Sequence, residues 1–118
     1  MKLNIYNKIL KKKPIIIAEA GVNHNGNKII GKKLIDEAKE AGADCIKFQT
    51  FKREKLTTKK AKRFWSWDGE KKKNGTQHDS YSVLDSFGYK DYKYLSDYCK
   101  KKGIEFQSTP FDLESIKL

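Results

Sequence analysis

Residues 14–50 have the sequence PIIIAEAGVNHNGNKIIGKKLIDEAKEAGADCIKFQT, and this stretch decides the fold class. Residues 15–18 form a short, continuous apolar run, which predicts a β-strand buried on both faces. Residues 27–41 place apolar side chains at helical spacing, with Asn25 or Asn27 as the N-cap and Gly42 just past the end. Residues 44–50 predict a second strand. The stretch is therefore a β-strand–helix–β-strand unit.

A second unit of the same kind follows after an interruption. Residues 51–80 are basic and contain several loop signals, so they predict irregular structure. Residues 81–87 predict a short helical turn, and an apolar stripe then predicts a helix that ends at Gly103. Residues 104–109 predict a third strand, and Asp112 is a suitable cap for another helix. Repeated units of this kind predict an α/β fold with parallel strands.

Length and composition limit the classes of protein to which the chain can belong. A chain of 118 residues fits one ordinary domain. Residues 1–13 are polar and lysine-rich, with only a weak alternation of apolar and polar residues. No apolar run approaches the ~18 residues of a membrane span, so the sequence predicts no membrane partner. Cys45 and Cys99 lie far apart in unrelated contexts, which indicates neither a disulfide framework nor a metal site.

The charge is strongly positive. The chain has 26 Lys and Arg residues against 15 Asp and Glu residues, a formal net charge of +11. Lysine clusters beside aromatic residues could bind the phosphates and bases of a nucleic acid. The lysines are scattered over several predicted elements, however, and not gathered on one face. This distribution favours a solvated surface over a nucleic-acid-binding surface. A positive field would also suit a small anionic substrate.

Polar side chains gather near the carboxyl end of each predicted strand. Side chains alternate between the two faces of a strand, so each strand presents one polar set. The carboxyl ends of parallel strands are where α/β folds bind their ligands. The convergence of these polar sets therefore predicts a site, although any single residue could equally be a strand-end ion pair or a loop cap. The polar sets are Glu19 on the first strand, Lys47 and Gln49 on the second, and Glu105, Gln107 and Thr109 on the third.

Three separated motifs resemble the N-acetylneuraminate (sialic acid) synthase family. They are IIAEAGVNHNG at 16–26, AGAD at 41–44 with KFQT at 47–50, and GIEF at 103–106 with STPFD at 108–112. The resemblance implies a partial TIM (β/α)8 barrel, of which this chain supplies the first three β/α units. Residues 14–118 would be the N-terminal part of that barrel and residues 1–13 a lead-in. The later barrel units and the family's small antifreeze-like domain would be absent, and the chain alone would be inactive.

The resemblance also implies an activity. Family members are cytoplasmic enzymes, commonly homodimers, that condense phosphoenolpyruvate with an N-acetylated hexosamine such as N-acetylmannosamine. The products are a nonulosonic acid and phosphate. The enzymes use Mn²⁺ or Mg²⁺, whose ligands would lie outside this chain. Synthesis of legionaminic acid or of a spore-coat sugar is the alternative within the family, and a small basic nucleic-acid-binding module is the alternative outside it.

Specific residues match the family's site. Glu19 matches the active-site glutamate and is expected to be catalytic. Lys47 matches a lysine that contacts phosphoenolpyruvate, Gln49 a glutamine near the sugar, and Thr109 a threonine near the phosphate. In the loop after the first strand, Asn23 and His24 are expected to shape the floor of the site. His78 is expected in a loop, and Asn74 is left out of the predicted site.

Overall fold

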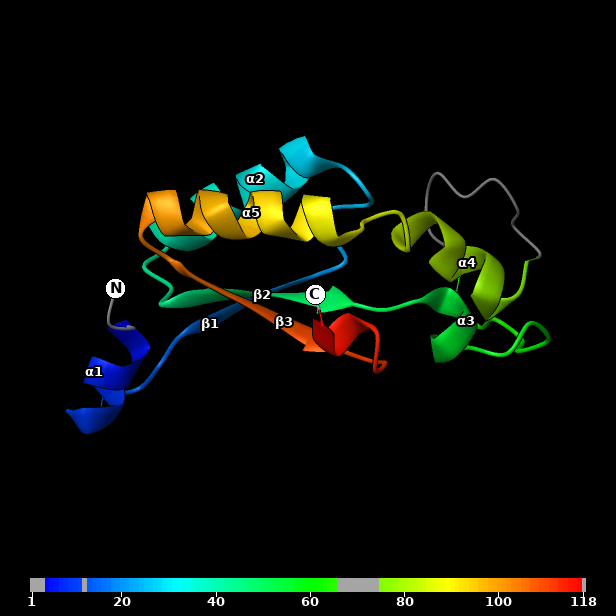
Figure 1. Ribbon diagram of the computed structural model, residues 1–118, viewed down its shortest axis with the longest axis horizontal. Coiled ribbons are helices and arrows are strands. Elements are labelled where there is room, and N and C mark those ends of the chain that lie inside the picture. The colour runs from blue at the N-terminus through cyan, green and yellow to red at the C-terminus, as the bar shows by residue number, and fades with distance from the viewer. Residues whose placement is uncertain (1–3, 12, 66–74, 118) are drawn as a thin grey trace.

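The fold is built on three parallel strands. The computed structural model describes residues 4–11, 13–65 and 75–117, and these contain β1 (Ile17–Gly21), β2 (Cys45–Thr50) and β3 (Glu105–Pro110). The strands form one sheet in the order β1-β2-β3 (Figure 1). The predicted parallel α/β fold is confirmed.

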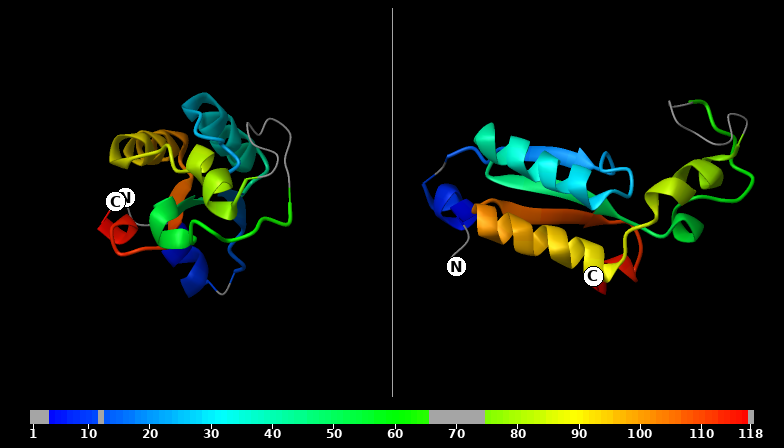
Figure 2. Two further views of the ribbon diagram at one scale, coloured as in Figure 1. Left: turned by 90° about the vertical axis from the view of Figure 1, so that its right-hand side faces the viewer. Right: turned by 90° about the horizontal axis from the view of Figure 1, so that it is seen from above.

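Two helices cover one face of the sheet. Helix α2 (Lys28–Glu40) begins where the Asn27 side chain accepts a hydrogen bond from the backbone N–H of Ile29 at 2.8 Å. Helix α5 (Tyr89–Lys102) ends at Gly103, which has the left-handed φ of 68° that favours glycine at this position. The start of α2 after Asn27 and the end of α5 at Gly103 agree with the sequence predictions. They lie side by side over the sheet in the end-on and top views (Figure 2).

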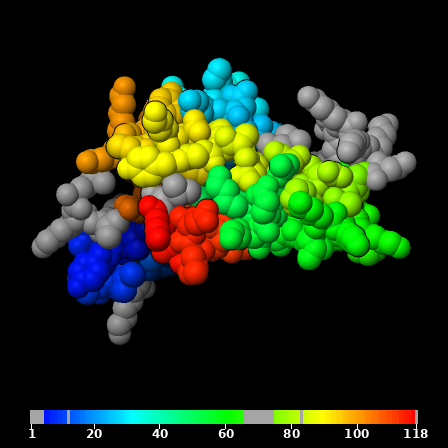
Figure 3. All heavy atoms as spheres, turned by 45° about the vertical axis from the view of Figure 1, so that its right-hand side comes forward, coloured from blue at the N-terminus to red at the C-terminus, as the bar shows by residue number. Residues whose placement is uncertain are grey.

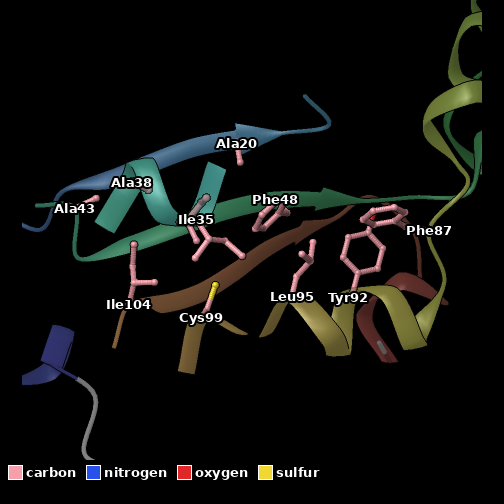
Figure 4. Close-up of a cluster of buried hydrophobic side chains, with 11 residues drawn as sticks. Ala20, Ile35, Ala38, Ala43, Phe48, Phe87, Tyr92, Leu95, Cys99 and Ile104 are labelled. Atoms are coloured by element: carbon pink, nitrogen blue, oxygen red, sulfur yellow. The ribbon is translucent and has the colours of Figure 1, made fainter. Parts of the chain in front are cut away.

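The core lies between these helices and the sheet (Figure 4). Ile35 of α2, Phe48 of β2 and Leu95 of α5 are fully buried there. At Gly31, an added Cβ would lie only 3.0 Å from Leu95 Cδ2, so the absence of a side chain allows α2 to approach α5. This layer holds the strands that carry the candidate site.

An arm of two short helices lies beyond the carboxyl end of β2. It comprises α3 (Arg53–Leu56) and α4 (Gln77–Leu84) (Figure 1). The prediction of a helical turn at 81–87 was wrong in its bounds. Thr76 and Asp79 form a reciprocal capping box, which starts the helix four residues earlier. His78 consequently lies in the first turn of α4 and not in a loop.

The first strand differs from its prediction. The strand begins at Ile17 and not at residue 15, and the side chains of Ile16 and Ile17 are 56% and 48% exposed. The prediction that this strand is buried on both faces was therefore wrong. In the described part of the chain, β1 lies at the edge of the sheet and pairs only with β2, so neighbouring structure covers less of it.

The two ends of the chain form short helices. The lead-in contains α1 (Asn4–Leu10), where the sequence showed only a weak alternation. Lys8 of α1 pairs with the Asp44 carboxylate at 2.5 Å, and the same carboxylate accepts from the Ile16 N–H at 2.9 Å. At the other end, Asp112 caps the 3₁₀ helix η1 (Ser115–Lys117) by accepting from the Ser115 N–H. Within the described residues, no helix has the length and apolarity needed to cross a bilayer.

Candidate functional site

The predicted polar residues lie in rows on the face of the sheet opposite α2 and α5. The strand register places Glu19 opposite Lys47, and Lys47 opposite Gln107. It also places Gln49 opposite Thr109, one step nearer the carboxyl ends. Residues in register on parallel strands point to the same face, so the three strands bring all four predicted site residues together. Gln107 was predicted on this face but not as a site residue.

Glu19 and Lys47 form an ion pair at the centre of this face. Lys47 Nζ lies 3.0 Å from Glu19 Oε2, with side chains that are 34% and 49% exposed, respectively. An ion pair this exposed contributes little to stability, since water solvates both charges well when they separate. The pair therefore leaves a cation and a carboxylate available to a ligand at low cost.

A local irregularity in β1 brings Gln49 toward the ion pair. The register between β1 and β2 shifts between Glu19 and Gly21, which indicates a bulge. A Cβ at Gly21 would lie 3.7 Å from Gln49 Nε2 and 3.8 Å from Glu19 Oε1. Both side chains thus border the open space over this glycine, whose φ of 53° further favours glycine. Sequence reasoning missed Gly21, and the bulge has no recognisable sequence signal beyond the glycine itself.

The backbone beneath these residues is held by polar contacts from the helix side. Tyr92 of α5 donates a hydrogen bond from its hydroxyl to the Gln49 carbonyl oxygen at 2.9 Å. Thr50 and Ser108 join the ends of β2 and β3 through their hydroxyl groups at 2.5 Å. Burial raises the pKa of Tyr92 to about 12, so its hydroxyl keeps its proton and remains a donor at neutral pH. The hydrogen bond from Tyr92 therefore fixes the backbone of Gln49 from the helix side of the sheet.

His24 does not lie on the open face, so the prediction that it shapes the floor of the site was wrong. Its ring is fully buried on the helix side, stacked on Phe87 with centroids 4.2 Å apart and near Phe48. Its Nδ1 accepts from the Gly26 N–H at 3.1 Å. Burial lowers the pKa of His24 to about 4, which keeps the ring neutral. The aromatic contacts come from β2, from α5 and from the segment before α5, which the local motif could not reveal.

The described residues do not form a metal centre. No group of three or more His, Cys, Asp or Glu side chains in them is arranged to hold an ion. Burial raises the pKa of both Cys45 and Cys99, to about 12 for Cys99, so these thiols lack the thiolate character of a ligand. Asn74 lies outside the described residues. A metal ion therefore has no binding set among the described residues.

The arrangement can bind an anion and place a carboxylate beside it. Lys47 supplies a fixed positive charge, while Gln49, Gln107 and Thr109 supply amide and hydroxyl hydrogen-bond donors on the same face. Glu19 can accept a hydrogen bond from a neutral group or from water. A small acid that carries phosphate or carboxylate groups is the ligand class these donors suit.

Known proteins match this chain over most of its length. It is 43% identical over 101 residues to the N,N'-diacetyllegionaminic acid synthase of Legionella pneumophila, a match that covers 86% of this chain and 28% of that protein. It is 44% identical over 107 residues to the enzyme of the same name from Campylobacter jejuni, covering 91% of this chain and 32% of that protein. The chain thus spans about a third or less of these relatives.

A solved structure agrees with the fold. The N-acetylneuraminic acid (sialic acid) synthetase of Leptospira borgpetersenii, solved with citrate, superposes with a TM-score of 0.65 at 32% identity. The superposition covers 88% of this chain and 32% of that one, and it identifies the three-stranded sheet with an N-terminal part of a TIM barrel. The model of the NeuB family matches residues 34–118. The chain therefore belongs to the NeuB family.

Proposed function

We propose that this chain forms the first three β/α units of a cytoplasmic synthase that condenses phosphoenolpyruvate with an N-acetylated hexosamine. The observation that carries the proposal is the Glu19–Lys47 pair on the uncovered face, with Gln49 and Thr109 in the next row toward the carboxyl ends. In a closed barrel this face is the interior, and the carboxyl ends form the rim where such enzymes bind substrate. The names of the relatives support the same reaction class.

In this proposal Lys47 and Thr109 bind phosphoenolpyruvate. The substrate carries a phosphate and a carboxylate, and both need charged or hydrogen-bonding donors. Lys47 gives a charge-assisted hydrogen bond to one of these anions, and the Thr109 hydroxyl donates to the phosphate. An incoming anion replaces Glu19 as the partner of Lys47, which separates the ion pair and frees the carboxylate.

Glu19 is the catalytic residue of the proposal. The C3 carbon of phosphoenolpyruvate forms a bond to the carbonyl carbon of the sugar, and the sugar oxygen gains a proton. Cationic character then develops at C2, water attacks there, and the C–O bond to phosphate breaks in the collapse that follows. A carboxylate beside C2 can hold the attacking water and relay its proton. Gln49, next to Glu19 across Gly21, donates or accepts at the sugar.

Residues 14–118 constitute the N-terminal part of the barrel in this proposal, and residues 1–13 are a lead-in whose helix α1 is tied to Asp44. The complete enzyme is a homodimer, and its divalent ion binds to residues beyond those described here. A precursor of legionaminic acid is the second candidate acceptor. It is favoured because the Legionella and Campylobacter relatives are both named as synthases of diacetyllegionaminic acid.

A chimera tests the proposal. This chain would replace the matching segment of the Legionella relative, to which it is 43% identical. Release of inorganic phosphate from phosphoenolpyruvate is then measured with N-acetylmannosamine, with a diacetylated hexosamine, and without sugar. We expect sugar-dependent release, and the better sugar identifies the acceptor. A folded chimera that releases no phosphate, beside an active parent enzyme, would contradict the proposal.

A further inference from the structure

The main-chain carbonyl of Gln49 lies where β2 outlasts its neighbour β1. The next carbonyl along, that of Thr50, accepts from the Phe111 N–H on the β3 side at 3.0 Å. Because successive residues of a strand direct their main-chain groups to opposite sides, the Gln49 carbonyl points to the β1 side. The pairing of β1 with β2, however, ends where Gly21 lies opposite Phe48. The Gln49 carbonyl is therefore one residue beyond the last pair, and its partner comes from outside the sheet.

Tyr92 supplies that partner. Its hydroxyl donates to the Gln49 carbonyl oxygen at 2.9 Å, in the place that a further residue of β1 would occupy in a longer ladder. The residue is only 7% exposed and belongs to the core cluster on the helix side of the sheet. The space-filling view shows α5 (yellow), which carries Tyr92, adjoining the arm (green) at this end of the molecule (Figure 3). A substrate on the open face is thus separated from the Tyr92 hydroxyl by the strand.

Two further rings hold Tyr92 in place. Its ring meets that of Phe87 edge-on, with centroids 5.6 Å apart and planes at 76°. Phe87 and Tyr92 lie side by side near the carboxyl end of β2 (Figure 4). Phe87 in turn stacks on His24, which comes from the loop after β1. Rotation of the Tyr92 hydroxyl away from Gln49 would break this packing, so the loop that follows β1 supports the side chain that replaces β1 in the ladder.

We propose that Tyr92 is a positioning residue for the acceptor sugar. Its hydroxyl fixes the peptide of Gln49, and the Gln49 side chain borders the open space over Gly21 beside Glu19. Lys47 lies in the paired part of β2, in register with Glu19, so its position does not depend on the Tyr92 hydroxyl. Tyr92 therefore acts on the sugar and not on phosphoenolpyruvate. The inference rests on the proposed function for the identity of the ligand at Gln49, whereas the position of Gln49 can be measured without it.

Tyr92→Phe in the chimera tests the inference, because it removes the hydroxyl and keeps the ring. The KM for the sugar should rise by about tenfold, the equivalent of one neutral hydrogen bond. The affinity for phosphoenolpyruvate, measured by calorimetry, should stay at the value of the parent chimera. Tyr98→Phe is the matched control. It removes another hydroxyl of α5, which donates to the Asp36 carboxylate at 2.9 Å, and it should leave the KM for the sugar unchanged.

Crystal structures of the parent and Tyr92→Phe chimeras separate this inference from the proposed function. We expect Gln49 to leave its position beside Gly21 in the variant, while the Glu19–Lys47 pair keeps its 3.0 Å separation. A Gln49 that stays in place would overturn the inference, as would equal rises in KM for the Tyr92 and Tyr98 variants. A parent chimera without phosphate release, beside a displaced Gln49 in the variant, contradicts the proposed function and supports the role of Tyr92 in placing Gln49. An active parent whose Gln49 is unmoved by the substitution contradicts this inference alone.

Discussion

The two faces of one sheet carry opposite properties. On the helix side, Phe48 is fully buried in one hydrophobic cluster with Ile35 and Leu95. On the other side, Glu19 and Lys47 lie partly exposed, each one residue away from a buried position, Ala20 and Phe48 respectively. Side chains alternate between the two faces of a strand. One set of residues therefore contributes to stability, and the set between them forms the candidate site. Changes on the two faces should therefore have separable effects, on stability for the helix face and on turnover for the open face.

The largest effect is expected at Glu19. In the chimera, Glu19→Gln should lower turnover by roughly 10²–10⁴-fold, the range for loss of a positioned acid–base group. Binding of phosphoenolpyruvate and the thermal midpoint should change little, because the carboxylate is half-exposed and Gln keeps its shape. Steady-state phosphate release and calorimetry provide the two measurements.

Glu105→Gln is the matched control for that variant. Glu105 lies on the same face but at the opposite end of the strands, in register with Cys45. The same chemical change there should leave turnover near that of the parent chimera. Equal losses from both substitutions would show that the carboxyl end of the sheet has no special role.

On the helix face, Leu95→Ala should lower the free energy of unfolding by about 2–5 kcal/mol, the range for a buried leucine. Gly31→Ala tests the packing further, because its Cβ would meet Leu95 Cδ2 at 3.0 Å. The glycine substitution should destabilise the wild-type chain but stabilise the Leu95→Ala variant, where the space is open. Denaturant titration of the four proteins measures this coupling. Additive effects would contradict the close packing of α2 on α5.

Sequence reasoning recovered the open face better than the helix face, for a physical reason. A strand has a fixed period of two, so Lys47 and Gln49 could be placed on one face of the second strand, opposite its helix-packing side, without tertiary information. The neighbours of His24 could not be found in this way, because Phe87 reaches it only through the packing of distant segments. The start of α4 was missed for a local reason, since Thr76 and Asp79 form a capping box inside a basic loop. Exposure of Ile17 follows from its edge position, which depends on the rest of the sheet.

His24 should make stability depend on pH. Its pKa is about 4 when folded and near the ordinary 6.5 when unfolded, so only the unfolded state gains a proton between these values. Stability should therefore be complete above pH 6.5 and decline as the pH falls toward 4, by roughly 3 kcal/mol in total. Urea titrations at pH 7, 6 and 5 measure this decline above the range where carboxylates titrate. His24→Phe keeps a ring against Phe87 and should flatten the dependence; an unchanged slope would assign it to other groups.

The smallest effect is expected at Lys47. Lys47→Ala should weaken phosphoenolpyruvate binding by about 10–100-fold, the equivalent of one charge-assisted hydrogen bond. The thermal midpoint should be nearly unchanged, since the ion pair is exposed. Lys102→Ala, which removes an ion pair with Asp36 elsewhere on the surface, is the control for the loss of one positive charge. Equal weakening by both variants would indicate a general field effect and not a site at Lys47.

A crystal structure of the chimera with phosphoenolpyruvate bound tests the central claim most directly. We expect the ligand on the open face, with an anionic group beside Lys47 Nζ, the phosphate within hydrogen-bond reach of Thr109, and Glu19 no longer paired with Lys47. Density for the ligand at the basic residues 52–63, with the Glu19–Lys47 pair intact at its 3.0 Å separation, would contradict the account.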